Sequence, residues 1–327
     1  MATYYDIKGQ KVQYLASDPN PVTEGQVWYN STSNTAKVRG VASNGVFSTT
    51  PNMNQEHNSS GAAGITTAAL CFGSTTPASG HEKSESYDGT SWTNTNDMTQ
   101  YGDYGSGFGT QTAAVSAGDG RPVGANSSNL WDGTCWTTGN PTVQYGYAGV
   151  GLGTQTAGML ASRYDGPGPG PTNYVELFNG TCFSNSPHDL NTSGYNAEGT
   201  GIQTAAIVIG GVGRGNATEE YNGGAWTNVN STNSPQNAGN ASGTQASAVV
   251  FAGNAAICEL WDGTCWTTNP GSMITGRSNV NNTIGAGPAG TSATSLALGG
   301  GPTATTRITV EEYTGPGSIL SKTITTT

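Results

Sequence analysis

The sequence predicts an all-β fold assembled from repeated units of short strands, and three observations predict it. Glycine is abundant, at 50 of 327 residues, whereas residues that favour helices are scarce. Two short markers recur along the chain in an order that never varies. No apolar pattern of helical period lies between them. Thr, Val, Tyr and Trp suit pleated strands, and Gly, Asn and Asp suit tight turns, so the composition favours many short strands.

The first marker is a glycine followed by a Thr/Gln/Ala stretch and an apolar run. It starts at Gly64, Gly109, Gly153, Gly201, Gly243 and Gly290, with spacings of 45, 44, 48, 42 and 47 residues. A short apolar run bounded by glycine is typical of a buried strand. We therefore expect this run to form the buried inner strand of each repeat.

The second marker is a pair of aromatic residues around an Asp-Gly or Asn-Gly segment, as in YDGTSW from Tyr87 to Trp92. This signal predicts two outer strands joined by a tight primed turn, with positive φ at both central positions. We expect the facing rings to fill the space between neighbouring units. The repeat-defining residues are Tyr87, Trp92, Trp131, Trp136, Phe178, Phe183, Tyr221, Trp226, Trp261, Trp266 and, in a worn sixth copy, Tyr313.

Six paired markers with a period in the mid-forties match the blade length of a β-propeller. We predict that residues 54–327 form this propeller, with six blades favoured. Residues 1–53 differ in character and form either an N-terminal attachment arm or part of a seventh blade, completed by the C-terminal strand at 319–326. Pairing the two chain ends would remove exposed strand edges, which gives the second arrangement a physical motive.

The order of features resembles the kelch family, whose repeats join a strand ending in Gly-Gly to a strand ending in Glu-x-Tyr and a later Trp. The fourth repeat has Gly210 and Gly211 before Glu219, Tyr221 and Trp226. The corresponding glutamates of other repeats are Glu85, Glu176, Glu259 and Glu311. Full Gly-Gly is missing from four repeats, and Asn129 replaces the glutamate of the second. The resemblance covers residues 54–327 and implies a galactose-oxidase-type propeller.

A second resemblance concerns residues 11–38, KVQYLASDPNPVTEGQVWYNSTSNTAKV. This run is similar to the N-terminal segment of virion proteins from tailed bacteriophages, particularly those infecting cyanobacteria. The resemblance implies a tail, neck or fibre component of the virion, with other virion proteins as partners and a homo-oligomeric assembly. Val27, Trp28 and Tyr29 would belong to the attachment arm. Residues 1–19 have no apolar signal-peptide core, as expected of a protein released by lysis.

Charge and composition argue against several classes of function. A net charge of −10 with only 11 Lys and Arg is unsuited to nucleic acid, which needs a basic face. No stretch approaches the roughly 18 apolar residues of a membrane span. Kelch-type propellers include copper oxidases, but His57, His81 and His188 occur singly in loops that we expect to be solvated, so we predict no metal or cofactor.

The remaining candidate groups have structural interpretations. We expect the strand glutamates to be hydrogen-bonded to neighbouring backbone, since buried carboxylates need partners. Cys135, Cys182 and Cys265 recur in a slot filled elsewhere by Ser91 and Ala225, which predicts a small-residue packing position without disulfides. We interpret the Asp-Gly pairs as turns. In the Asp boxes of sialidases one residue separates Asp from Gly, whereas here the two are adjacent. We predict no catalytic residues and no enzymatic activity.

The leading hypothesis is a non-enzymatic virion protein that presents a propeller, with a host-surface glycan as candidate ligand. Tyr101, Tyr104, Tyr145 and Tyr147 could stack on sugar rings or pack between strands. The loops GDGRP (118–122) and GPGPGP (166–171) are read as turns, with Ca²⁺ or phosphate binding the alternative for the first. A cellular kelch-type interaction module is the alternative function. A carbohydrate-active enzyme, with unrepeated carboxylates at the channel mouth, is the third.

Overall fold

The computed structural model describes residues 12–19, 26–41, 44–77, 80–118, 126–166, 168, 170–253, 256–277, 294–301, 303–316 and 319–324. Within these residues the chain is all-β, as predicted, with one short helix, α2 (Ala304–Ile308). No helix among the described residues has the length and apolar character needed to cross a lipid bilayer. The chain divides into two compact units, residues 47–313 and residues 1–46 with 314–327.

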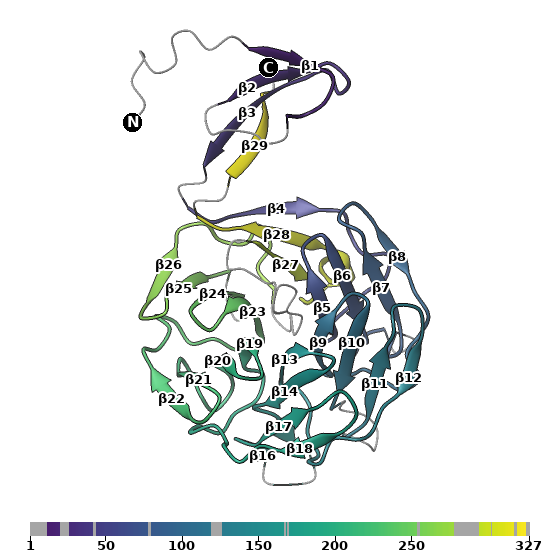
Figure 1. Cartoon of the computed structure of the whole chain (residues 1–327), viewed down its shortest axis with the longest axis vertical. Coiled ribbons are helices and arrows are strands. Elements are labelled where there is room, and N and C mark those ends of the chain that lie inside the picture. The colour runs from purple at the N-terminus through teal and green to yellow at the C-terminus, as the bar shows by residue number, and fades with distance from the viewer. Residues whose placement is uncertain are drawn as a thin grey trace. The chain divides into compact units, whose positions relative to one another are not determined.

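The larger unit contains five four-stranded antiparallel sheets and one three-stranded sheet, arranged around a common centre (Figure 1). We number them 1 to 6 along the chain. Sheet 1 is β5 (Gly61–Ile65), β6 (Ala68–Phe72), β7 (Ser84–Tyr87), β8 (Trp92–Asn94). Sheet 2 is β9 (Ser106–Thr110), β10 (Ala113–Ala117), β11 (Ser128–Trp131), β12 (Trp136–Thr138). Sheet 3 is β13 (Val150–Thr154), β14 (Ala157–Ala161), β17 (Val175–Phe178), β18 (Phe183–Asn185), with the pair β15 (Tyr164–Asp165) and β16 (Gly170–Pro171) in its loop.

The remaining sheets repeat this order. Sheet 4 is β19 (Glu198–Ile202), β20 (Ala205–Ile209), β21 (Thr218–Tyr221), β22 (Trp226–Val229). Sheet 5 is β23 (Gly239–Thr244), β24 (Ser247–Ala252), β25 (Cys258–Trp261), β26 (Trp266–Asn269). Sheet 6 is β27 (Thr294–Leu298), β28 (Val310–Thr314) and β4 (Val46–Thr50).

The first strand of each four-stranded sheet is the innermost one. Strands β5, β9, β13, β19 and β23 contact one another in succession and lie nearest the centre (Figure 1). The apolar run of the first marker is buried, as predicted, but it forms the second strand of each sheet and not the innermost. The innermost strand is rich in glycine because neighbouring backbones approach closely there; a Cβ on Gly107 would lie 2.5 Å from the backbone nitrogen of Ala62.

The recurring glutamine of the first marker hydrogen-bonds each sheet to the one before it, and the recurring glycine allows the turn that carries this glutamine. Gly109 is the next-to-last residue of β9 and has a φ of 115°, and a Cβ there would lie 2.3 Å from the carbonyl oxygen of Ala113. Gln111, in the turn that follows, donates its Nε2 to the carbonyl oxygen of Tyr87 at 2.6 Å. Equivalent bonds run from Gln155 to Trp131, from Gln203 to Phe178 and from Gln245 to Tyr221.

Six buried apolar clusters lie between consecutive sheets, one for each neighbouring pair. Between sheets 1 and 2, for example, the rings of Phe72 and Trp136 have centroids 4.9 Å apart. The cluster between sheets 6 and 1 brings Leu296 and Leu298 against Tyr87 and Trp92, so the ring of sheets is closed. This arrangement fits a β-propeller.

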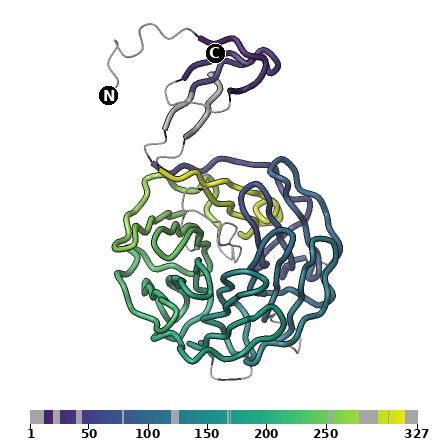
Figure 2. Tube along the Cα trace, viewed as in Figure 1, coloured from purple at the N-terminus to yellow at the C-terminus, as the bar shows by residue number. Residues whose placement is uncertain are grey.

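The outer strand of sheet 6 comes from the other end of the chain. In Figure 2 the N-terminal strand β4 runs beside the C-terminal part of this sheet. The ring of Phe47 in β4 has its centroid 5.0 Å from that of Tyr313. Phe47 therefore takes the place that the second aromatic residue has in the other sheets, which the worn sixth copy of the marker at Tyr313 does not itself supply.

The smaller unit is one sheet in the order β1 (Gln13–Leu15), β2 (Val27–Asn30), β3 (Thr35–Val41), β29 (Ile319–Ile324). Strand β1 runs parallel to β2, and β29 pairs antiparallel with β3. Residues 319–324 therefore complete this separate sheet and not a seventh sheet of the ring. The predicted boundary near residue 53 also shifts, because β4 belongs to sheet 6 while residues 314–324 group with the N-terminal segment.

Candidate functional site

The segments that enter the innermost strands carry one unusual backbone position in each repeat. These positions have φ values of 50–56° at Ser59, Tyr104, Ala148, Asn196 and Ala238. Residues with a side chain seldom adopt this conformation, which costs on the order of 1–3 kcal/mol and tends to occur at functional sites. The last four of them donate their N–H to the carbonyl oxygen of the equivalent residue one sheet earlier, at 2.7–3.0 Å, and Ser59 accepts the first of these bonds. The result is a chain of backbone hydrogen bonds that fixes the loops near the centre.

Four half-buried tyrosines lie in a row along these loops. The centroids of Tyr104 and Tyr147 are 5.7 Å apart, those of Tyr147 and Tyr164 are 5.4 Å apart, and those of Tyr164 and Tyr195 are 4.9 Å apart. We call these four residues the tyrosine row. Of the predicted candidates, Tyr104 and Tyr147 are thus brought together. Tyr164 and Tyr195 were missed. A repeated Gly-Tyr pair could have found Tyr195, since Gly194-Tyr195 matches Gly146-Tyr147, whereas Tyr164 lies in β15 and has no such signal.

Three further tyrosines in this part of the chain are more exposed. Tyr101 is 42%, Tyr145 is 51% and Tyr174 is 40% accessible. Tyr101 and Tyr145 precede Tyr104 and Tyr147 in the same linkers. The ring centroid of Tyr101 lies 5.2 Å from that of His81. An aromatic ring with a hydroxyl offers one apolar face and one polar edge, a combination suited to a sugar ring.

A small pocket lies at the starts of four innermost strands. Its walls are Gly107, Gly151, Gly199 and Gly239 with the side chain of Glu198, and its volume is about 20 Å³. Glu198 is 3% exposed, and its Oε1 accepts the N–H of Gly239 at 2.5 Å, whereas its Oε2 has no hydrogen-bond partner. Burial raises the pKa of this carboxyl to about 8, against the lowering effect of the Gly239 hydrogen bond and the charge of Arg214.

The five repeated glutamates are not part of a site, because each is saturated by structural partners. Glu176 accepts the backbone N–H groups of Val143 and Gln144 at 2.8 and 2.9 Å. Two successive linker N–H groups bond in the same way to Glu85, Glu219, Glu259 and Glu311. The prediction that these glutamates bind neighbouring backbone is confirmed.

Most of these glutamates also contact a cationic side chain that reaches them from one of two directions. Arg163 and Arg214 come from the loop after the second strand and contact Glu176 and Glu219. Arg277 comes from a linker and lies 2.5 Å from Glu311. Where the arginine comes from the loop after the second strand, the linker has a glycine opposite it, because a larger residue would clash with the arginine. A Cβ on Gly194, for example, would lie 2.4 Å from Cδ of Arg214.

His57 is the cationic residue that contacts Glu85. Its Nε2 lies 3.3 Å from Glu85 Oε1 and its Nδ1 lies 2.9 Å from the carbonyl oxygen of Gly73. Both ring nitrogens face acceptors, so both carry protons. Burial alone would lower the pKa of His57, but Cys71, Glu85 and the Gly73 carbonyl raise it to about 10. The expectation of a solvated histidine was wrong here, since His57 is fully buried.

The other two histidines do not gather ligands for a metal. His81 contacts the carboxylate of Asp103 and the carbonyl oxygen of Ser74 through Nδ1. His188 lies with its ring centroid 6.5 Å from that of Tyr221. Across the described residues, no group of three or more His, Cys, Asp or Glu side chains could hold a metal ion.

The predicted aromatic pairs lie opposite one another in register and are buried. The centroid distance is 5.0 Å for Tyr87 and Trp92, and equivalent contacts join Trp131 to Trp136, Phe178 to Phe183, Tyr221 to Trp226 and Trp261 to Trp266. None of these ten side chains is more than 7% exposed. They fill the spaces between sheets and leave no ring free to contact a ligand.

The turns inside these pairs differ from the prediction. Asp88 Oδ1 accepts the N–H groups of Thr90 and Ser91 at 2.8 Å, and only Gly89 has a positive φ. The four-residue turn is therefore held by an aspartate side chain, and a two-residue primed turn was the wrong expectation. The same bonds form at Asp132, Asn179, Asn222 and Asp262.

The recurring cysteine slot is the last residue of this turn. Cys135, Cys182 and Cys265 are exposed, so the prediction of a packing position was wrong. The slot is defined by its backbone N–H, which bonds to the turn aspartate or asparagine. Cys71 and Cys258 are buried, and no disulfide joins any of the five.

In the smaller unit, the three predicted attachment residues differ in exposure. Trp28 is fully buried and donates its Nε1 to Asp18 Oδ1 at 2.9 Å, so it is a core residue. Val27 and Tyr29 are half-buried. The ring of Tyr29 stacks on that of Tyr14 at 5.1 Å, and Tyr14 is 75% exposed. Among the aromatic residues that the structure describes in this unit, Tyr14 is therefore the most accessible.

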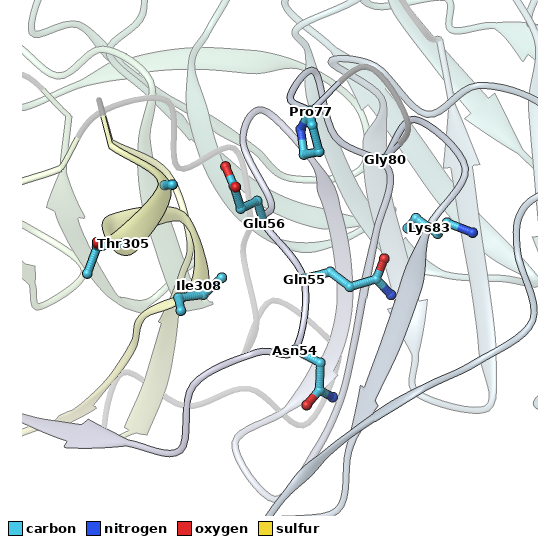
Figure 3. Close-up of a pocket in the computed structure, with 9 residues that line it drawn as sticks. Asn54, Gln55, Glu56, Pro77, Gly80, Lys83, Thr305 and Ile308 are labelled. Carbon is cyan, nitrogen blue, oxygen red and sulfur yellow. The ribbon is translucent and has the colours of Figure 1, made fainter.

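A second hollow is an open groove between α2 and the loop after β6, with a volume of about 650 Å³ (Figure 3). Glu56 lies between Thr305 and Pro77 in this view. Its carboxylate already pairs with Arg307 at 3.1 Å, and Lys83 at the rim pairs with Asp97 at 2.6 Å. The charges of the groove are thus engaged within the protein.

The two irregular loops singled out in the sequence are only partly described. Residues 119–122 of GDGRP lie outside the described residues, as do residues 167 and 169 of GPGPGP. The residues flanking the second loop pair as β15 and β16.

No protein-family model matches the sequence, and no curated protein matches it either.

Proposed function

We propose that this protein is a non-enzymatic component of a tailed-phage virion that binds a host-surface glycan through its tyrosine-bearing loops. The observation that carries the binding proposal is the tyrosine row, together with the exposed Tyr101 and Tyr145 in the same linkers as Tyr104 and Tyr147. Rigid loops favour such a role, because a preorganised aromatic surface loses little entropy on binding. The central pocket supplies one carboxyl group, that of Glu198, whereas glycoside hydrolysis uses two.

We further infer that sheets 1 to 6 are the six blades of a kelch-like propeller. Six apolar clusters between consecutive sheets support this count. The strand glutamates, with their recurrent backbone and cationic partners, give a physical reason for the Glu-x-aromatic pattern that resembles kelch repeats. Closure of sheet 6 by β4 is consistent with the same reading.

The smaller unit is the proposed attachment module. Its support is the resemblance of residues 11–38 to phage virion proteins, together with the exposed Tyr14 on a compact sheet of its own. The partners would be other virion proteins, and a homo-oligomer would match the rotational symmetry of a tail. Nucleic acid and membrane lipid are not proposed as partners, because the chain is acidic.

Glycan binding can be tested with the full chain on a glycan array and by titration of the best glycan. A double variant, Tyr101→Ser with Tyr145→Ser, should weaken binding about tenfold or more, since each stacked ring contributes on the order of 1 kcal/mol. The control is Tyr14→Ser, which removes an exposed tyrosine from the other unit and should leave affinity unchanged. Equal loss in both variants, or no glycan bound by the wild type, would contradict the proposal.

The virion assignment needs a different measurement. A cryo-EM map of the native source particle should show the smaller unit packed on a tail, neck or capsid protein. A chain that never copurifies with particles would instead favour a free interaction module of the cell.

A further inference from the structure

The tyrosine row is fixed in place by its backbone, while three of its hydroxyl groups are free. The backbones of Tyr147 and Tyr164 exchange two hydrogen bonds, at 2.9 and 3.1 Å. Tyr195 exchanges two with Val212, at 2.8 and 3.2 Å. Among the described residues, the hydroxyl groups of Tyr104, Tyr164 and Tyr195 have no hydrogen-bond partner, and none of them is a buried atom. These three hydroxyl groups can therefore donate hydrogen bonds to a ligand or accept them from it.

The row bends as it passes from sheet to sheet. Tyr104 precedes β9, Tyr147 precedes β13 and Tyr195 precedes β19, the innermost strands of sheets 2, 3 and 4 (Figure 1). Successive ring planes are tilted by 48°, 52° and 69°. One flat ligand cannot lie on rings that face different directions, whereas a chain of linked units can turn from one ring to the next. The centroid spacings of 4.9–5.7 Å are close to the length of one sugar unit in such a chain.

The larger unit is strongly acidic. Residues 47–313 contain 6 Lys and Arg against 18 Asp and Glu, which gives a formal net charge of −12. Five of these six cations lie in the described residues, and each pairs with a carboxylate: Lys83 with Asp97, Arg163 with Glu176, Arg214 with Glu219, Arg277 with Glu311 and Arg307 with Glu56. The sixth, Arg121, lies outside the described residues. No described Lys or Arg of this unit is thus left to bind an anionic ligand.

An acidic residue also adjoins the row. Asp165 follows Tyr164 in β15 and is half-buried. Its Oδ1 accepts the N–H of Gly168 at 3.1 Å, and its Oδ2 has no hydrogen-bond partner among the described residues. A carboxylate in this position can accept a hydroxyl group of a neutral sugar, whereas it repels a carboxylate, phosphate or sulfate group.

We propose that the ligand of the tyrosine row is an uncharged sugar chain of several units, and that acidic glycans are excluded. This inference rests on the proposed glycan binding and adds the chemical class of the glycan. Binding comes from ring contacts and from hydrogen bonds to the free hydroxyl groups, without an ion pair. Because these contacts are uncharged, the affinity should not depend on salt. Because they are distributed along a row, the affinity should increase with the length of the chain.

The first experiment is a glycan array probed with the labelled full chain. It carries neutral oligosaccharides of hexose, deoxyhexose and N-acetylhexosamine units, and acidic ones with uronate, sialate, phosphate or sulfate groups, each in several chain lengths. The glycans bound should be neutral, with an affinity that rises from one to about four sugar units, one for each ring of the row. Calorimetric titration of the strongest neutral binder should give dissociation constants within about twofold of each other at about 0.05 and 0.5 M NaCl.

The second experiment removes the free hydroxyl groups and keeps the rings. A triple variant with Tyr104→Phe, Tyr164→Phe and Tyr195→Phe should bind that glycan about tenfold more weakly or worse, since each lost hydrogen bond weakens binding severalfold. The matched control is Tyr14→Phe, which removes an exposed tyrosine hydroxyl from the smaller unit and should leave the affinity unchanged. Thermal melts of the three chains show whether the loss of affinity occurs without loss of the fold.

The outcomes separate this inference from the proposed function. If the wild type binds acidic glycans as well as neutral ones or better, the inference is wrong while glycan binding stands, and loss of that binding in Arg121→Gln would identify the cation responsible. An unchanged affinity of the triple variant for the neutral glycan also overturns the inference, because the free hydroxyl groups would then make no contact. If the array shows no binding at all, both the inference and the proposed function fail.

Discussion

At the scale of single residues, the chain places many charged groups inside a ring of sheets and pairs nearly all of them. The carboxylate of Glu176 illustrates the arrangement, with two backbone N–H groups on one side and Arg163 on the other. Removing one partner of such a buried pair leaves an uncompensated charge, which is more costly than removing both. These residues therefore act through stability, while the tyrosine row is left open to a ligand.

Arg163→Leu should lower the free energy of unfolding by about 3–5 kcal/mol, because Glu176 would stay buried without its cation. Urea unfolding followed by tryptophan fluorescence measures this change. The control is Lys83→Met, since Lys83 pairs with Asp97 at the surface and solvent screens that pair. The interpretation fails if the two variants unfold at the same urea concentration.

Glu198 should make stability depend on pH. Its pKa of about 8 in the folded chain lies above the ordinary value of 4.5, so the folded state holds the proton more tightly. This contribution is complete below pH 4.5 and is lost as the pH rises through 8, by up to about 1.4 kcal/mol per pH unit. Glu198→Gln should therefore be more stable than the wild type at pH 9 and similar to it at pH 5, as thermal melts at both pH values would show. A constant difference between the two chains would rule this out.

At the scale of secondary-structure elements, two backbone devices repeat around the ring. The next-to-last residue of each innermost strand (β5, β9, β13, β19 and β23) is a glycine in positive φ, and a tight turn follows it into the buried second strand. Each outer hairpin turns through a segment held by an Asp or Asn side chain. Both devices depend on local geometry that one residue type satisfies best.

Gly109→Ala should destabilise the chain by more than about 1 kcal/mol, because the new Cβ would meet the carbonyl oxygen of Ala113 and the φ of 115° disfavours a side chain. Gly224→Ala is the matched control, since the nearest atom to its Cβ would be 3.7 Å away. Chemical denaturation of both variants checks the difference. Comparable midpoints would show that the close contact at Gly109 relaxes without cost.

At the scale of the whole molecule, closure of the ring joins the two ends of the larger unit. Sheet 6 takes β27 and β28 from the C-terminal part and β4 from the N-terminal part. The ring contact of Phe47 with Tyr313 and Phe251 fills the cluster between sheets 5 and 6. An open sheet edge would otherwise remain at this point, so closure should govern the cooperativity of folding.

A chain of residues 45–316 keeps β4 and should unfold in one cooperative transition, at a melting temperature close to that of the larger unit in the full chain. A chain of residues 52–316 lacks β4 and should melt at a clearly lower temperature, with early loss of protection in β28. Calorimetry and hydrogen exchange report both quantities. Indistinguishable melting of the two chains would mean that β4 contributes little to closure.

The repeats, the all-β character and the pairing of aromatic residues followed from the sequence, because local markers at a fixed spacing specify strands and turns without reference to distant parts of the chain. The structural role of the strand glutamates could also be foreseen, since a buried carboxylate in a strand must find donors. The identity of the innermost strand could not, because a glycine-rich segment has no apolar periodicity and its reason for being glycine lies in a neighbouring backbone.

Only the tertiary structure decided which residues meet across the ring. Phe47 packs against Tyr313, which lies 266 residues further along the chain, and no local sequence pattern predicts this contact. His57 becomes a buried cation because Glu85 and Gly73 face its two nitrogens. Tyr164 and Tyr195 lie outside the two markers, and they join the tyrosine row because the ring of sheets brings separate loops together. The sequence thus determined the repeating unit, and the closed ring determined the site, since a site formed by separate loops exists only once the units surround the centre.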